Sequence, residues 1–298
     1  MSKQTKGTFA ALDLEHEIFD TLAIDKNPPG WWLKILDDNE LYVEVRKDNY
    51  INVYFYGGCL LKITYNKITK RLQAETHRKY MGGDTTLIKK GEYRVCSEKL
   101  ENPGYLQILK ENIRKIYLKD NDEGDKKRIK DKLTVSSEKK VQGELILDNR
   151  NLYVDSEFAY ALPRQNTEGK NKVIRFDLVS LDNGMLKFVE LKLISDPRLR
   201  GENIDILKQM EKYSTYIKDN KDEFVTYYTK VAEIKHRIGV WKNKPIIKDI
   251  DQSPILLLVN NYRSPLPKGR RTERIEDIEC ILKKENIDYQ ILDYSKCK

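Results

Sequence analysis

The feature that most constrains the fold is a strand–turn–strand pattern over residues 174–194. Residues 174–181 and 185–194 each have the apolar content of a β-strand, and the Asp-Asn-Gly at residues 182–184 is typical of a hairpin turn. In an antiparallel hairpin, residues that are far apart in the chain lie opposite each other. The pattern therefore predicts a sheet in which polar side chains of the two strands are brought together.

The other elements of this half of the chain predict an α/β fold with a mixed sheet. Besides the hairpin, we expect helices over residues 136–148, 204–217 and 273–285, and strands over residues 152–160, 255–259 and 289–292. Ser136 and Ser137 can cap the first of these helices. Residues 134–298 are accordingly interpreted as one α/β domain.

The first part of the chain has the pattern of an antiparallel meander. Strands are expected over residues 41–45, 50–56 and 59–65, with turns between them. We interpret residues 1–105 as a β-rich N-terminal domain that recognises substrate or a partner. One face of its second strand carries the polar side chains Tyr50, Asn52, Tyr54 and Tyr56. Such tyrosines can stack on bases, but more often they cover a sheet face.

Positive charge favours nucleic acid as the partner. The chain has 298 residues and a net charge of +8, with a pI of about 9.0. Basic runs occur at Lys126–Lys132, inside a charged helical linker expected over residues 106–133, and at Lys268–Arg271. Clusters of this kind contact phosphates, although a run of lysines can equally be a solvated surface.

Cysteine, histidine and apolar patterns argue against several other classes of protein. The 4 cysteines include no C-x-x-C pair and the 3 histidines share no metal-ligand spacing, so neither a zinc site nor a disulfide framework is expected. No stretch reaches the roughly 18 apolar residues that cross a bilayer. The N-terminus lacks the apolar core of a secretory signal. We therefore expect a cytoplasmic protein without a membrane partner.

Three residues of the predicted hairpin carry the chemistry. Strand pairing brings Asp177 beside Glu190, and Lys192 lies two residues beyond Glu190 and so on the same sheet face. Burying these groups among apolar neighbours would be costly without a function. Asp177 and Glu190, with the carbonyl of Leu191, can hold Mg²⁺ or Mn²⁺. Lys192 can orient or deprotonate the attacking water and offset negative charge on a phosphate.

The pattern Asp177…Glu190-x-Lys192 resembles the PD-(D/E)XK nuclease superfamily, with Phe176 in place of the proline. Upstream, residues 137–142 are similar to the S-E-x-x-L-Q stretch of archaeal-type mismatch and flap endonucleases. Downstream, Gln209 and Tyr213 match the Q-x-x-x-Y of RecB-like nucleases, at a spacing that puts both on one helix face.

The resemblance covers about residues 136–216. It implies a restriction-endonuclease-like mixed sheet flanked by helices, and Glu138 as a third carboxylate that joins the metal site. Glu144 and Glu157 compete with Glu138 for that role. Gln209 and Tyr213 are expected to complete the pocket wall, although they can also be an ordinary polar stripe on a helix.

The function expected from these residues is a Mg²⁺- or Mn²⁺-dependent endonuclease acting on DNA. Fold analogy suggests bacterial defence or restriction, with a homodimer or partner protein contacted through the N-terminal domain. The alternative is a catalytically inactive nucleic-acid-binding or protein-interaction module on a nuclease-like fold. A complete Asp177, Glu190 and Lys192 set favours the enzyme.

Overall fold

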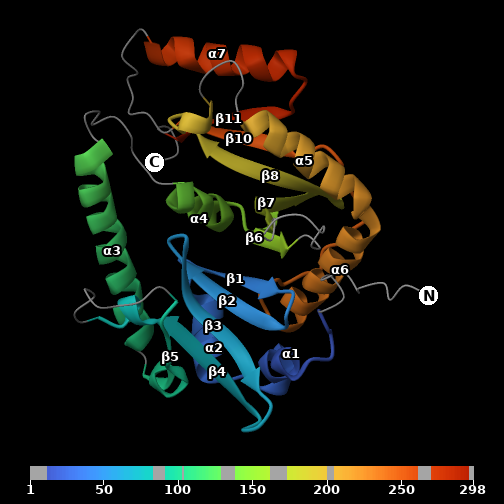
Figure 1. Ribbon diagram of the computed structural model, residues 1–298. Coiled ribbons are helices and arrows are strands. Elements are labelled where there is room, and N and C mark those ends of the chain that lie inside the picture. Colours follow the sequence, from blue (N-terminus) through green and yellow to red (C-terminus); the bar gives the residue numbers. More distant parts are fainter. Residues whose placement is uncertain are drawn as a thin grey trace, which may run out of the picture. The chain divides into compact units, whose positions relative to one another are not determined.

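The computed structural model describes residues 12–82, 91–102, 104–128, 138–161, 173–199, 205–260 and 270–294 (Figure 1). Internal contacts divide the chain into two compact units that interleave along the sequence. The N-terminal unit comprises Met1–Lys127, Lys139–Arg150 and Thr226–Ile246. The C-terminal unit comprises Arg128–Glu138, Asn151–Val225 and Ile247–Lys298. The sequence pattern, by contrast, predicted two continuous domains joined by a linker.

The N-terminal unit contains a five-stranded antiparallel meander in the order β1-β2-β3-β4-β5. Its strands are β1 (Leu41–Arg46), β2 (Tyr50–Phe55), β3 (Gly58–Asn66), β4 (Arg71–His77) and β5 (Tyr93–Val95). Asn49 and Gly57, which precede β2 and β3, both have positive φ, as tight turns between paired strands require. The meander predicted for β1 to β3 is confirmed.

Three helices help to form the apolar core of this unit. They are α1 (Glu17–Leu22), α2 (Gly30–Asp37) and α3 (Tyr105–Arg128). Trp32 of α2 is fully buried, as are Leu109 and Ile113 of α3, which lie four residues apart on one helix face. The first turns of α3 therefore pack in the N-terminal unit, in a stretch that the sequence had assigned to a linker.

Helix α4 (Glu138–Asp148) also packs on the N-terminal sheet for most of its length. Gly143 approaches the β2–β3 turn so closely that a Cβ atom there would lie 3.0 Å from the Gly57 amide nitrogen. A Cβ on Gly57 would lie 2.2 Å from the Lys139 carbonyl oxygen. Only Glu138, its first residue, belongs to the C-terminal unit, which carries Asp177.

The C-terminal unit contains a mixed sheet in the order β11-β10-β8-β7-β6, with β9 paired to the start of β8. Its strands are β6 (Tyr153–Ala161), β7 (Val173–Asp182), β8 (Met185–Leu193), β9 (Asp249–Ile250), β10 (Ile255–Asn260) and β11 (Tyr289–Asp293). β6, β7 and β8 pair antiparallel, and β8, β10 and β11 pair parallel. The predicted hairpin is confirmed, with positive φ at Asn183 and Gly184.

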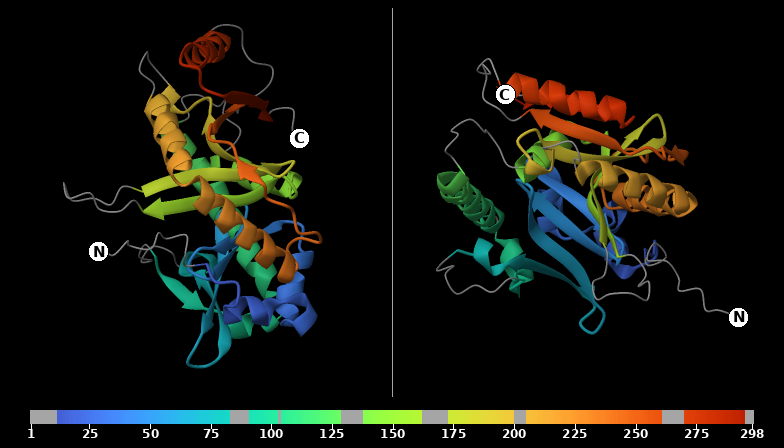
Figure 2. Two further views of the ribbon diagram at one scale, coloured as in Figure 1. Left: turned by 90° about the vertical axis from the view of Figure 1, so that its right-hand side faces the viewer. Right: turned by 45° about the horizontal axis from the view of Figure 1, so that its top comes forward.

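Helices α5 (Asp205–Asp219) and α7 (Arg270–Lys284) lie beside this sheet (Figures 1 and 2). Met210 of α5 and Leu282 of α7 share one buried cluster with Leu256 and Leu258 of β10. Since Leu256 and Leu258 pair with Glu190 and Lys192 of β8, this cluster packs on the sheet face of the two charged residues.

Helix α6 (Lys221–Arg237) was not anticipated from the sequence, and it contributes residues to both units. Phe224, near its start, packs against Phe158 and Phe188 of the C-terminal sheet, with ring centroids 5.6 and 4.7 Å apart. Its later residues, such as Tyr228 and Ile234, are buried in the N-terminal unit. Within the described ranges, no helix has the length and apolar character to cross a membrane.

Candidate active site

The site begins where the pairing of β7 with β8 ends. The regular antiparallel register runs as far as Leu178 opposite Val189. Beyond that point, the backbone N–H of Leu191 donates to the Asp177 side chain, Oδ2, at 2.9 Å. The Asp177 carboxylate therefore stands where a main-chain acceptor would otherwise lie, and it is anchored to the strand that carries Glu190 and Lys192.

Lys192 is the centre of the site and its side chain is only 2% exposed. Its Nζ donates to the Leu191 carbonyl at 2.7 Å and to Asp177 Oδ2 at 3.4 Å, and it contacts Glu190 Oε1 closely. An ammonium group has three hydrogens, so protein atoms engage all of them. Lys192 therefore holds both strand carboxylates and the main chain in one arrangement.

Glu138 is the third carboxylate at this centre. Its Oε1 lies 3.9 Å from Lys192 Nζ, and its side chain is 36% exposed, against 16% for Asp177 and 3% for Glu190. The exposure of the three carboxylates thus increases from Glu190, through Asp177, to Glu138. Glu138 is the first residue of α4, where the positive end of the helix dipole favours a negative charge.

The competing carboxylates make ion pairs elsewhere. Glu144 Oε1 lies 3.5 Å from Lys140 Nζ, one turn away on α4, within the N-terminal unit. Glu157 lies 3.7 Å from Arg175 and has a positive φ of 55°, an irregular conformation in β6. Of the three candidates that the sequence left open, the structure brings Glu138 to Lys192.

The electrostatics of the site are dominated by burial and excess negative charge. Desolvation, opposed in part by Lys192, raises the pKa of Glu138 to about 7. Desolvation and the neighbouring Asp177 also raise the pKa of Glu190. For Lys192, desolvation acts to lower the pKa, but the surrounding carboxylates hold it above its ordinary value. Three carboxylates thus lie around one buried ammonium group, and burial is the largest influence on the pKa of Glu138 and Glu190.

Gln209 and Tyr213 of α5 join the site through one hydrogen-bond chain. Gln209 Nε2 donates to Glu190 Oε1 and to the Tyr213 hydroxyl, each at 2.7 Å. The Tyr213 hydroxyl donates to the Arg175 carbonyl, and its ring packs on Phe176 with centroids 4.5 Å apart. The pair therefore orients Glu190 instead of forming a solvated stripe on α5.

Sequence reasoning missed a further pair, Asp196 and Arg198, directly after β8. The Arg198 guanidinium binds the Asp196 carboxylate through Nε at 3.1 Å and through Nη2 at 2.6 Å. Both residues act electrostatically on Glu138. The signal that could have revealed them is the Asp-Pro-Arg turn that follows the Glu-x-Lys strand within a few residues.

The donor set fits a divalent cation, although the carboxylates now surround Lys192. In the described part of the chain, no three or more His, Cys, Asp or Glu side chains are already grouped as a metal site. However, Glu190 Oε2 is buried without a hydrogen-bond partner. A buried carboxylate oxygen in this state is costly, and a hard cation would satisfy it. Glu138, Asp177 and Glu190 supply the oxygen ligands that Mg²⁺ and Mn²⁺ prefer.

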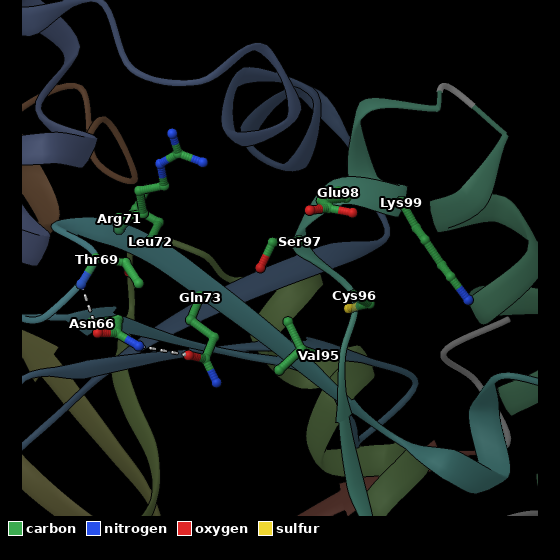
Figure 3. Close-up of a pocket in the computed structure, with 10 residues that line it drawn as sticks. All are labelled: Asn66, Thr69, Arg71, Leu72, Gln73, Val95, Cys96, Ser97, Glu98 and Lys99. Atoms are coloured by element: carbon green, nitrogen blue, oxygen red, sulfur yellow. Dashed lines mark hydrogen bonds between the residues drawn. The ribbon is translucent and has the colours of Figure 1, made fainter.

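A separate hollow of about 680 Å³ lies in the N-terminal unit beside β4 (Figure 3). Several of its polar groups are engaged within the fold. Ser97 Oγ accepts a hydrogen bond from the Ala74 amide at 2.8 Å, and Asn66 Oδ1 accepts from the Thr69 amide at 3.1 Å. Cys96 also lines it, and desolvation raises the pKa of its thiol to about 12. The hollow holds no group of carboxylates comparable to that around Lys192.

One of the tyrosines predicted to lie on a face of β2 is buried. Tyr54 is buried and stacks on Tyr42, with ring centroids 5.1 Å apart. Its hydroxyl accepts hydrogen bonds from Arg46 at 2.8 Å and from Asn52 at 3.1 Å. Tyr54 therefore covers the sheet and is not available to stack on a base.

Some predicted residues lie outside the described ranges. They are the capping residues Ser136 and Ser137 and much of the basic runs at Lys126–Lys132 and Lys268–Arg271. Comparisons with protein families, with characterised proteins and with solved structures found no match. The function of the site must therefore be inferred from its own geometry and chemistry.

Proposed function

We propose that the protein is a metal-dependent endonuclease that hydrolyses phosphodiester bonds in DNA. The observation that carries this proposal is the convergence of Glu138, Asp177 and Glu190 on the buried Lys192. The combination of hard oxygen ligands with a fixed ammonium group suits the attack of water on a phosphodiester. The resemblance of these positions to the PD-(D/E)XK motif supports the same chemistry.

Mg²⁺ or Mn²⁺ would be held by Asp177, Glu190 and the Leu191 carbonyl, with Glu138 as the more exposed carboxylate. A cation bound there would polarise the phosphate and lower the pKa of water at the site. The partnerless oxygen of Glu190 supports this ligand set, because a hard cation would satisfy it. Burial raises the pKa of Glu138, and a bound cation would offset that cost of desolvation.

The remaining residues would position the reacting groups. Lys192 already donates to Asp177 and to the Leu191 carbonyl, so it would fix the positions of these two metal ligands. It would also place positive charge beside the phosphate. Gln209 would hold Glu190 in one rotamer through its 2.7 Å hydrogen bond. Tyr213 would fix Gln209 in turn, since it joins α5 to the Arg175 main chain.

The mixed sheet and its flanking helices support a restriction-endonuclease-like fold for the C-terminal unit. The N-terminal unit would then recognise DNA or a partner protein, and the chain would act in the cytoplasm, in defence or restriction. These assignments rest on fold analogy, which is a weaker argument than the chemistry of the site.

A plasmid-nicking assay tests the proposal. Purified protein is incubated with supercoiled DNA and Mg²⁺, with Lys192→Ala as the inactive variant. Lys283→Ala serves as a matched control, because Lys283 is 68% exposed and pairs with Glu279 on α7. We expect nicking by the wild-type protein and by Lys283→Ala only. DNA binding without any metal-dependent nicking would instead identify a non-enzymatic nucleic-acid-binding protein.

A further inference from the structure

The turn after β8 is rigidly built around Asp196. The Asp196 amide donates to the Leu193 carbonyl at 2.8 Å, and the Asp196 carboxylate accepts from the Arg198 amide at 2.8 Å. Arg274 Nη2 of α7 donates to the Asp196 carbonyl at 2.9 Å. The short 3-10 helix at Pro197–Leu199 buries Leu199 beneath this turn. The backbone that carries Arg198, a few residues beyond Lys192, is therefore held in one conformation.

The Arg198 guanidinium is bound along one edge only. Nε and Nη2 donate to the Asp196 carboxylate, whereas Nη1 has no hydrogen-bond partner among the described residues. A guanidinium group has five N–H donors in a planar fork, so the Nη1 side can bind a second oxyanion while Asp196 holds the first edge. The side chain is 47% exposed, which leaves that side accessible.

Arg198 is an exposed cation that acts electrostatically on Glu138. The charged groups that act on Glu138 are Lys192 and Arg198, which are basic, and Asp177 and Asp196, which are acidic. Lys192 is buried and its donors are engaged by protein atoms. A phosphate that approaches Glu138 from solvent can therefore meet Arg198, a cation that still has a donor available.

We infer that Arg198 binds a phosphate group of the nucleic-acid substrate through its Nη1 side, and that Asp196 is its positioning residue. The inference rests on the proposed function, which it extends by a substrate-binding residue. Arginine suits this role better than lysine, because its fork can contact a carboxylate and a phosphate at the same time.

The test measures DNA binding separately from cleavage. A fluorescent DNA duplex is titrated with wild type, Arg198→Ala, Arg198→Lys and Lys283→Ala in Ca²⁺, in which we expect binding but little cleavage. For Arg198→Ala we expect a Kd about 10-fold higher and a salt slope reduced by about one. Arg198→Lys should keep the salt slope but still bind more weakly. Lys283→Ala should bind as the wild type does.

Asp196→Asn tests the positioning role. It should raise KM for the same duplex in Mg²⁺ more than it lowers kcat, because it loosens Arg198 and leaves the residues Glu138, Asp177, Glu190 and Lys192 in place. Its melting temperature, measured in parallel, shows whether the turn remains folded. An equal loss of kcat and folded protein, with KM unchanged, would contradict positioning.

The outcomes separate this inference from the proposed function. If Arg198→Ala binds and cleaves DNA as well as Lys283→Ala does, the inference is overturned and the nuclease function stands. If binding depends on Arg198 but no variant cleaves DNA with Mg²⁺, the inference is supported and the nuclease function is refuted. A wild-type protein without DNA affinity would overturn both.

Discussion

Two of the buried lysines, Lys235 in the N-terminal unit and Lys192 in the C-terminal unit, have different surroundings. Lys235 of α6 pairs with Glu44 of β1 at 2.6 Å, and both side chains are 3% exposed. Lys235 also lies over the Trp241 ring, 5.0 Å from its centroid. Lys192 of β8 is buried to a similar degree, but it meets the carboxylates of Glu138, Asp177 and Glu190.

The difference lies in the balance of charge. The Glu44–Lys235 pair joins one carboxylate to one ammonium group, and no oxygen of Glu44 is among the partnerless buried atoms of the described chain. Around Lys192, the negative charge exceeds the positive charge and Glu190 Oε2 has no partner. A balanced buried pair can serve the fold alone, whereas an unbalanced cluster takes up a proton or binds a further cation.

Substitutions in the group formed by Asp177, Glu190 and Lys192 should affect activity most, because we expect them to abolish cleavage. Asp177→Ala, Glu190→Ala and Lys192→Ala should each lower the cleavage rate by roughly 1,000-fold or more. Because the three act as one unit, a double variant should be little slower than either single one. Rates on a labelled duplex measure this, with circular dichroism to verify folding. A near-normal rate for Lys192→Ala would show that the assigned mechanism is wrong.

Removal of divalent metal should have a comparable effect on activity. We expect no cleavage in excess EDTA, recovery with Mg²⁺ or Mn²⁺, and little activity with Ca²⁺, whose looser coordination positions water poorly. Mg²⁺ should also raise the melting temperature of the wild-type protein, since a ligand at 100 times its Kd stabilises the folded state by about 2.7 kcal/mol. Glu190→Gln should show a smaller rise. Full activity in EDTA would contradict the metal site.

Breaking the balanced pair should instead affect stability. Glu44→Ala or Lys235→Ala leaves one buried charge without its partner, and we expect the free energy of unfolding to fall by about 3–5 kcal/mol. Replacing both residues with apolar ones of similar volume should restore most of that loss. Urea unfolding measures the effect. If either single variant lost cleavage while remaining folded, the contrast between the two lysines would not hold.

The smallest effect is expected at the hydroxyl of Tyr213. Tyr213→Phe keeps the ring against Phe176 but removes the bonds to Gln209 and to the Arg175 carbonyl. We expect a loss of about 1 kcal/mol in stability and a modest fall in cleavage rate. Gln209→Leu should slow cleavage more, because Glu190 Oε1 loses a direct donor. Equal cleavage rates for Gln209→Leu and the wild type would show that Gln209 has no role in the site.

Much of the C-terminal unit could be predicted because its signals are local. The Asp-Asn-Gly turn and its flanking apolar runs predict the β7–β8 hairpin, and pairing across the hairpin brings Asp177 towards Glu190. The four-residue spacing of Gln209 and Tyr213 likewise places them together on α5. Each of these relations is set by strand or helix geometry over a short stretch of chain.

Some elements that were not predicted also have a local pattern in the sequence. Helix α6 has apolar residues at helical spacing, including Phe224, Tyr228 and Val231. Even so, its division between the two units depends on partners that are distant in the sequence. The same is true of α4, whose Gly143 meets Gly57 at the end of a strand pair far upstream.

The hairpin, and the alternation that places Glu190 and Lys192 on one sheet face, could be predicted from the sequence, because both follow from short-range backbone geometry. The three-dimensional fold was needed to show that Glu138, and not Glu144 or Glu157, reaches Lys192, and that Asp196 binds one edge of the Arg198 guanidinium. Those choices depend on how separate elements pack and on which charges find partners. Such contacts join distant residues, and spacing within one helix or strand does not determine them.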